Sequence, residues 1–479
     1  MSKKSMRSQA NDATTTSAPS AVEIAPSPNK PSSGVTTSKE SVRRFKHLRL
    51  IILIGIFIPL AYFGGRQINA NWQSDKIRNS IRKFDDRTAL EQIRQIENRA
   101  GKTGELEFLR SRAYRHLANY EKSQQHLELA RQMKYEPEIL RREQMLLDAQ
   151  QGYIEEPEKN FDKLIEQAGS DFGEVCLAFT YGYLIRMRFQ EAMGMIGLWK
   201  RQEPKSPQPP YLMGLLAQYQ RKWEAADKLF DESLKFQKDF LPTVLSKAQN
   251  KLKLSQFAEA VPYYKDYLAR VPDNADAQRG LAEALFGSGS PGESQLILKE
   301  LIDSGNRSFE TRLLLGKSQL ETGDAKGAVD TLVPLAQLWP DDVDLNYTLS
   351  RAYSQTGQED RANVHLALME AGRKKIEDID LRLREAEVAQ DNPMLRYEMG
   401  HLLMHYSSRE EGRVWLQSAL MQNPNIIAAH QDLEQYFTRS GDSAMAMYHR
   451  SIIKKMGGEV QQPPTSPQNP NQANSPKPS

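Results

Sequence analysis

The sequence contains a single cysteine, Cys176, among 479 residues. One thiol cannot form an intrachain disulfide, and it cannot supply the paired cysteine ligands of a structural zinc site. Cys176 falls at a packing position of a helical pattern with no assigned His or Asp partner, so we predict a buried, unreactive thiol. A P-loop is missing too, and no Ser/His/Asp set or carboxylate pair stands out. We therefore predict no catalytic residue, no cofactor and no enzymatic activity.

An excess of one charge is also lacking, because the formal net charge is only +3. Residues 1–49 hold nine Lys/Arg against three acids, which leaves 55 basic and 58 acidic residues in the remainder. Binding to a phosphate backbone depends on clustered Lys/Arg. The slightly acidic body therefore predicts no nucleic-acid partner.

Long apolar runs are scarce, and the one present is residues 50–65, sixteen residues without a charge. As a helix it would span about 24 Å, short of the ~30 Å hydrocarbon core, but Leu48 and the flanking Arg49 and Arg66 can extend it. A buried core helix is the alternative. Because a basic segment precedes the run and no small-x-small cleavage site follows it, we predict an uncleaved transmembrane helix at 48–65, in contact with the lipid bilayer.

The charges beside this helix predict its orientation. Four Lys/Arg lie in residues 40–49 against one in residues 66–75, which puts the N-terminus in the cytoplasm and the rest of the chain on the extracytoplasmic side. Over twenty-residue flanks the counts are six and five, so the orientation rests on the nearest ten residues.

What the chain has in abundance is a period of 34 residues with two helical patterns in each period. A fixed period of this length is the signature of a helical solenoid. Units start at 173, 207, 241, 275, 309 and 343, and again at 393 and 427. The recurring residues include Leu281, Leu315, Leu349, Gly289, Gly323 and Gly357.

Three positions of the unit carry a family resemblance. Small residues at positions 8 and 20 let two helices approach, and proline at position 32 prevents the second helix from continuing. These residues are Gly214, Ala248, Ala282, Gly316 and Gly400, then Ala192, Ala226, Ala260, Ala328, Ala362 and Ala446, then Pro204, Pro272, Pro340 and Pro424. The pattern resembles the tetratricopeptide repeat (TPR) family over about 104–460. It implies an all-α fold: a right-handed α-solenoid of antiparallel helix pairs, here behind one N-terminal transmembrane helix.

Composition and register divide the chain into seven segments. The Ser/Thr/Pro-rich start and the proline-rich end cannot bury enough apolar surface to fold. The predicted segments are a disordered basic cytoplasmic tail (1–47), the transmembrane helix (48–65), a helical linker or capping hairpin (66–103), a TPR array (104–376), an inserted or extended helix (377–392), two C-terminal TPRs (393–460) and a disordered Pro-rich tail (461–479).

The resemblance implies that partner proteins or peptides bind along a concave groove lined by the first helix of each unit. Tyr and Arg are favoured interface anchors, although a solvated inner helix face has a similar composition. The candidate groove contacts are Tyr181, Tyr211, Tyr219, Gln249, Arg279, Glu283, Lys317, Tyr347, Arg351, His401 and His405.

Two motifs in the repeats match ligand sites in spacing only. Residues 287–292 read G-x-G-x-x-G, but a dinucleotide site needs a preceding strand, and these glycines fall at a hairpin turn. His401 and His405 are spaced to face one metal ion, yet Leu402 replaces the zincin glutamate and no third ligand is assigned. We expect a turn and two solvated histidines, and no metal.

The leading hypothesis is a membrane-tethered scaffold or adaptor, similar in layout to bacterial scaffolds for envelope assembly or secretion. Alternatives are a regulatory TPR protein acting on the soluble side, or a metal- or ligand-binding accessory subunit of an enzyme. The sequence specifies neither the partner nor the oligomeric state.

Overall fold

The computed structural model describes residues 73–186, 188–388 and 392–459. The chain divides into residues 1–71 and 72–479, and all described residues belong to the second unit. The predicted tails and the predicted transmembrane segment at 48–65 lie outside the described residues. Within the described ranges, no helix is both long and apolar enough to cross a membrane.

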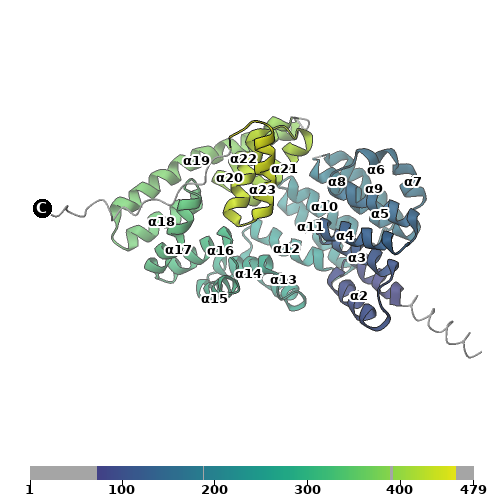
Figure 1. Ribbon diagram of the computed structural model, residues 1–479. Coiled ribbons are helices and arrows are strands. Elements are labelled where there is room, and N and C mark those ends of the chain that lie inside the picture. The colour runs from purple at the N-terminus through teal and green to yellow at the C-terminus, as the bar shows by residue number, and fades with distance from the viewer. Residues whose placement is uncertain (1–72, 187, 389–391, 460–479) are drawn as a thin grey trace, which may run out of the picture. The chain divides into compact units, whose positions relative to one another are not determined.

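Every regular element in the described ranges is helical, and successive helices form hairpins (Figure 1). The all-α repeat fold is therefore confirmed. Before the repeats come residues 73–82 and α2 (Asp86–Ala100). The hairpins are α3 (Gly104–His116) with α4 (Tyr120–Gln132), α8 (Phe172–Ile185) with α9 (Phe189–Gln202), α10 (Gln208–Tyr219) with α11 (Trp223–Phe236), α12 (Leu241–Lys253) with α13 (Phe257–Arg270), α14 (Ala275–Gly287) with α15 (Pro291–Asp303), α16 (Phe309–Glu321) with α17 (Ala325–Leu338), α20 (Pro393–Tyr406) with α21 (Arg409–Gln422), and α22 (Ile427–Ser440) with α23 (Ser443–Lys455).

Two units depart from the simple hairpin. After α5 (Pro137–Gln150) the second helix is split into α6 (Glu155–Lys159) and α7 (Phe161–Glu166), followed by a short 3-10 turn, η1 (Gly169–Asp171). After α18 (Val343–Gln355) the second helix, α19 (Glu359–Val388), runs for 30 residues. The stretch at 377–388 thus prolongs α19, and residues 389–391 are outside the described ranges.

Short polar caps set where the first helices begin. The side chains of Asn274, Ser308 and Asp342 accept hydrogen bonds from the backbone N–H groups three residues later, at the start of α14, α16 and α18. Such caps satisfy donors that a helix start leaves unpaired. At the hairpin turn between α14 and α15, Gly289 has φ +90°, a left-handed conformation that glycine adopts without a steric cost. The G-x-G-x-x-G stretch is a helical hairpin turn, as predicted.

The small residues predicted to bring paired helices together are found at the contacts. A Cβ on Gly316 would lie 2.5 Å from Leu332, and one on Gly400 would lie 2.7 Å from Leu416 Cγ, on the second helix of the same hairpin. The alanines at position 20 are buried throughout the described repeats. The close approach of the two helices therefore depends on these residues.

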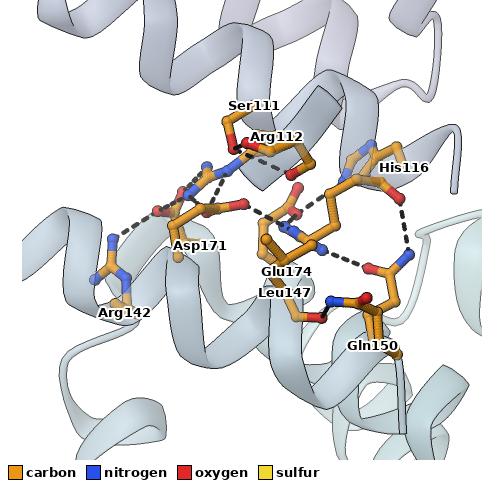
Figure 2. Close-up of polar contacts among 12 residues, drawn as sticks. Ser111, Arg112, His116, Arg142, Leu147, Gln150, Asp171 and Glu174 are labelled. Atoms are coloured by element: carbon orange, nitrogen blue, oxygen red, sulfur yellow. Dashed lines mark hydrogen bonds and ion pairs between the residues drawn. The ribbon is translucent and has the colours of Figure 1, made fainter. Parts of the chain in front are cut away.

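A network of buried ion pairs joins three first helices at the N-terminal end (Figure 2). On α3, Arg115 donates from Nε to Glu143 Oε1 of α5 (2.8 Å) and from Nη2 to Glu174 Oε2 of α8 (2.6 Å). Arg112 of α3 also donates to Glu143, with Nη2 2.8 Å from Oε2. Arg115 and Glu143 are fully buried. Because a buried charge is costly unless paired, these residues fix how the three helices pack.

His116 belongs to the same network. Its Nε2 lies 2.8 Å from Glu174 Oε2 and its Nδ1 lies 3.1 Å from Asp86 Oδ1. Burial alone would lower the pKa of His116, but the charges of Glu174 and Asp86 raise it to about 9. Below that pH the imidazolium is an additional cation among the buried carboxylates.

The His116 pKa predicts a loss of stability in mild alkali. The folded pKa of about 9 exceeds the unfolded value of about 6.5, so the contribution is complete below pH 6.5 and disappears as the pH rises through 9. We expect the free energy of unfolding of the N-terminal repeats to fall by up to about 3 kcal/mol over that window. Urea titrations at several pH values measure it. His116→Gln should flatten this slope, and an unchanged slope would contradict the assignment.

Substitution by alanine should have opposite effects on stability at two glycines: Gly182, at the contact between α5 and α8, and Gly194, on the exposed face of α9. A Cβ on Gly182 would overlap the carbonyl oxygen of Ala149 and lie 2.8 Å from Ile154 Cγ2, so Gly182→Ala should cost about 1–3 kcal/mol of unfolding free energy. Gly194 is exposed within α9 with no atom within 4 Å of its added Cβ, so Gly194→Ala should be neutral or stabilise by up to ~1 kcal/mol. Denaturant titrations of the two variants test this difference in sign.

Candidate functional site

A cavity of about 580 Å³ lies between the first helices of three consecutive repeats and a helix that follows much later in the chain. α10, α12 and α14 form one wall, and α21 forms the other. The lining residues are Phe189, Leu215, Gln218, Tyr219, Gln220, Arg221, Trp223, Gln249, Leu252, Lys253, Tyr264, Asp276, Arg279, Gly280, Glu283, Glu410, Glu411, Val414 and Trp415.

Aromatic side chains supply much of the apolar surface in this cavity. Tyr219, the last residue of α10, is 49% exposed, and Trp415 of α21 and Trp223 of α11 are partly exposed. Desolvation by the surrounding protein raises the pKa of the Tyr219 hydroxyl. Tyr264 is buried beneath Gly280, where an added Cβ would overlap its ring. The arrangement provides flat apolar surface with polar edges, as in many binding sites.

Most charges at the cavity already have partners. Glu411 of α21 lies 3.5 Å from Arg221 Nη2 and 3.8 Å from Lys253 Nζ, which links the two walls. Arg279 lies 3.0 Å from Asp276. Glu283 on α14 is exposed, and no ion pair of its carboxylate occurs among the described residues. The cavity therefore presents one carboxylate whose charge is not already matched by a cation.

Hydrogen bonds to the turn after α8 hold the C-terminal repeats beside the earlier ones. Arg186 donates from Nη1 to the carbonyl of Met421 (3.1 Å), and Ser418 Oγ donates to the carbonyl of Ile185 (3.1 Å). Arg396 of α20 donates to the carbonyl of Arg186 (3.0 Å). These contacts join residues more than 200 positions apart and position α21 as a wall of the cavity.

A buried cation at the start of α21 ties the same hairpin to α16–α18. Arg409 Nη2 lies 2.6 Å from Asp342 Oδ2, and both side chains are almost fully buried. The guanidinium carbon also lies 3.4 Å from the ring centroid of Phe309 and 4.8 Å from that of Trp339. Asp342 additionally caps α18. One carboxylate thus organises both the start of α18 and the docking of α21.

The predicted groove residues fall into four groups. Tyr219, Gln249, Arg279 and Glu283 line the cavity, which brings together four residues from three repeats. Lys317 pairs with Asp344 (2.8 Å) and Arg351 with Glu321 (2.9 Å), so these cations bridge neighbouring first helices.

The remaining tyrosines lie elsewhere. Tyr211 is buried, and Tyr181 packs against the same core. Tyr347 is 47% exposed, outside the cavity lining. That these positions contact a partner remains a prediction.

Several residues that line the cavity were not among the groove contacts predicted from the sequence. Trp223, Glu410, Glu411 and Trp415 line the cavity, and all four lie on second helices rather than first ones. The repeat register gives no sign that α21 returns to α10–α14.

The structure also supplies a neighbour for the predicted histidine pair. His401 Nδ1 lies 2.8 Å from Asp432 Oδ2, and His405 Nε2 lies 3.5 Å from Asp432 Oδ1. The hydrogen bond to Asp432 raises the pKa of His401, and burial opposes this effect. Cys176, in contrast, is fully buried, and burial raises the pKa of its thiol to about 12, which leaves it protonated.

Comparisons with known proteins agree with the repeat pattern. Residues 245–306 match a family model described as tetratricopeptide repeat. A search of curated proteins finds no match. Among solved structures, a tetratricopeptide repeat protein from Parabacteroides merdae is 16% identical, with 55% of this chain and 97% of that chain covered and a TM-score of 0.35. A thermophilic TPR protein of Thermus thermophilus is 24% identical, with 38% of this chain and 97% of that chain covered and a TM-score of 0.31. A chain of the APC/C hetero-tetramer Cut9–Hcn1 is 13% identical, with 81% of this chain and 81% of that chain covered and a TM-score of 0.32.

The Arg409–Asp342 pair predicts a local loss of stability on substitution. Arg409→Met keeps much of the side-chain volume but leaves a buried carboxylate without its cation, which typically costs 3–5 kcal/mol, here about 3. Arg413→Met removes an exposed pair with Glu410 on the same helix and should cost less than about 0.5 kcal/mol. Hydrogen exchange of the α20–α21 amides measures both. Equal protection in the two variants would show that the buried pair does not hold α21.

Proposed function

We propose that this tetratricopeptide-repeat protein is a scaffold that binds a segment of a partner protein in the cavity between α10–α14 and α21. The cavity carries this proposal because it gathers predicted groove residues with exposed aromatic rings in a concave surface. Repeat proteins of this kind are generally non-catalytic and hold proteins or peptides. The partly exposed Tyr219 and Trp415 are the side-chain types that most often anchor an interface.

The lining favours a partner segment with a bulky apolar side chain next to Lys or Arg. The aromatic rings offer apolar contact area at little cost in side-chain entropy. Glu283 offers a carboxylate to the incoming cation, whereas the arginine and lysine side chains of the lining are occupied by Glu411 and Asp276. A strongly acidic segment is disfavoured, because the cations of the lining are already paired and the carboxylate of Glu283, which has no ion pair among the described residues, would repel it.

The proposal includes a membrane tether. The uncharged run at 50–65 and the basic residues before it support a single transmembrane helix at 48–65, with the N-terminus cytoplasmic and the repeats on the other side. Such a tether would hold the cavity at a membrane surface and raise the effective concentration of the scaffold near partners there. A role in envelope assembly or secretion fits this layout.

Peptide selection tests the binding site. Peptides selected from a random library on the full chain in detergent should be enriched in an aromatic or large aliphatic residue beside Lys or Arg. Trp415→Ala should weaken the selected peptide at least tenfold because a central anchor is lost. Tyr347→Ala is the matched control, since Tyr347 is exposed but outside the cavity. Binding is measured by fluorescence anisotropy.

A charge reversal separates the apolar and ionic parts of the proposal. Glu283→Lys should weaken a basic peptide severalfold and leave a peptide with the cation replaced by Gln nearly unchanged. If Trp415→Ala and Glu283→Lys both bind like wild type, the partner site lies elsewhere and the proposal fails.

Topology is tested with a reporter that is active on one side of the membrane only. A periplasmic-type reporter such as alkaline phosphatase, fused after Ser479, should be active in the full chain and inactive when residues 48–65 are deleted. Activity of a cytoplasm-specific reporter at the same position would reverse the orientation.

A further inference from the structure

Two imidazoles and one carboxylate converge between α20 and α22. His401 and His405 lie one turn apart on α20, so they share a face of the helix. Asp432 of α22 directs one oxygen to each ring, with distances of 2.8 Å to His401 Nδ1 and 3.5 Å to His405 Nε2. One candidate ligand atom from each of the three residues lies within 4.8 Å of the other two.

We propose that His401, His405 and Asp432 bind one divalent transition-metal ion, for which Zn²⁺ is the best match. Two histidines and a carboxylate form a ligand set used by zinc sites that keep a fourth position open. Tetrahedral bonds near 2.1 Å place ligand atoms about 3.4 Å apart. The two Asp432 contacts, at 2.8 and 3.5 Å, are made by different oxygens, and one ligand atom of each residue lies within 4.8 Å of the other two, so side-chain rotations must bring these three atoms to that spacing.

Burial gives this site one fixed ligand and one open side. The Asp432 side chain is only 9% exposed, whereas that of His401 is 40% exposed and that of His405 is 20% exposed. The carboxylate is therefore held between the two helices, and the imidazoles have room to rotate toward an ion. A water molecule can reach the fourth position from the side of His401.

The chemistry of the three ligands excludes hard cations as occupants. Mg²⁺ and Ca²⁺ require several oxygen ligands, and Asp432 is the one carboxylate in this cluster. Imidazole nitrogen favours Zn²⁺, Cu²⁺, Ni²⁺ or Co²⁺. Arg409 and Arg439 stack on Trp339, whose ring lies 6.4 Å from that of His405. Their positive charge opposes the binding of any cation, so a metal ion can bind here only through strong coordination by the imidazole nitrogens.

Metal binding at this position would clamp two repeats together. α20 and α22 are the first helices of the last two repeats, and the three ligands are shared between them. An ion that binds the folded arrangement and not the unfolded chain stabilises the fold. Because a histidine nitrogen must be free of its proton to coordinate a metal ion, affinity should fall as the pH is lowered.

Calorimetric titration of the full chain with ZnCl₂ tests the site, in detergent and without an affinity tag. We expect one equivalent of Zn²⁺ to bind, MgCl₂ to give no binding heat, and Zn²⁺ to raise the melting temperature. His401→Gln and Asp432→Asn should each weaken Zn²⁺ at least tenfold. His365→Gln, which removes a histidine bonded to Asn346 (2.7 Å), should bind like wild type.

A second measurement on the wild-type chain does not depend on how the variants fold. Co²⁺ in a four-coordinate site gives strong visible absorption bands, and one equivalent of added Zn²⁺ should abolish them. Wild-type chain that binds no stoichiometric Zn²⁺, or His401→Gln that binds it as tightly as wild type, would overturn the proposal. In that case the three residues form hydrogen bonds alone.

Discussion

In hairpins such as α16–α17 and α20–α21 the two helices approach closely because a glycine on one helix leaves room for a larger side chain on the other. Gly316 faces Leu332, and Gly400 faces Leu416 in the same way. A single hairpin cannot bury the outer faces of its own helices, so each unit depends on the next for its core. The array follows from that packing.

Buried charges add a second level of order. The Arg112–Arg115–Glu143–Glu174 network joins α3, α5 and α8, and Arg409 joins α21 to the cap of α18. Pairs of this kind contribute little net stability compared with apolar side chains, but they penalise any other arrangement, because a mispaired buried charge is expensive. Apolar packing stabilises the contacts between repeats, and these ion pairs determine which surfaces pack together.

Periodicity predicted the helices well because it reports local packing. The first helices α8, α10, α12, α14, α16, α18, α20 and α22 begin within one residue of the units found in the sequence. The sequence predicted a groove along the first helices and gave no indication of the second wall, on α21. Tyr219 and Glu283 follow from the register, whereas Trp415 reaches them through contacts such as Arg186 with Met421, between residues far apart in the chain. Asp432, likewise, is placed beside His401 by the packing of two repeats, which no spacing rule encodes.

The division of the cavity between distant helices has a consequence for synthesis. One wall is complete when the chain has been made as far as Gly287, the end of α14, but the other begins at Arg409. A nascent chain between these two points has half a site, and so has any product cut short before α21. A partner that needs both walls can therefore engage the protein only after the chain has been made as far as α21.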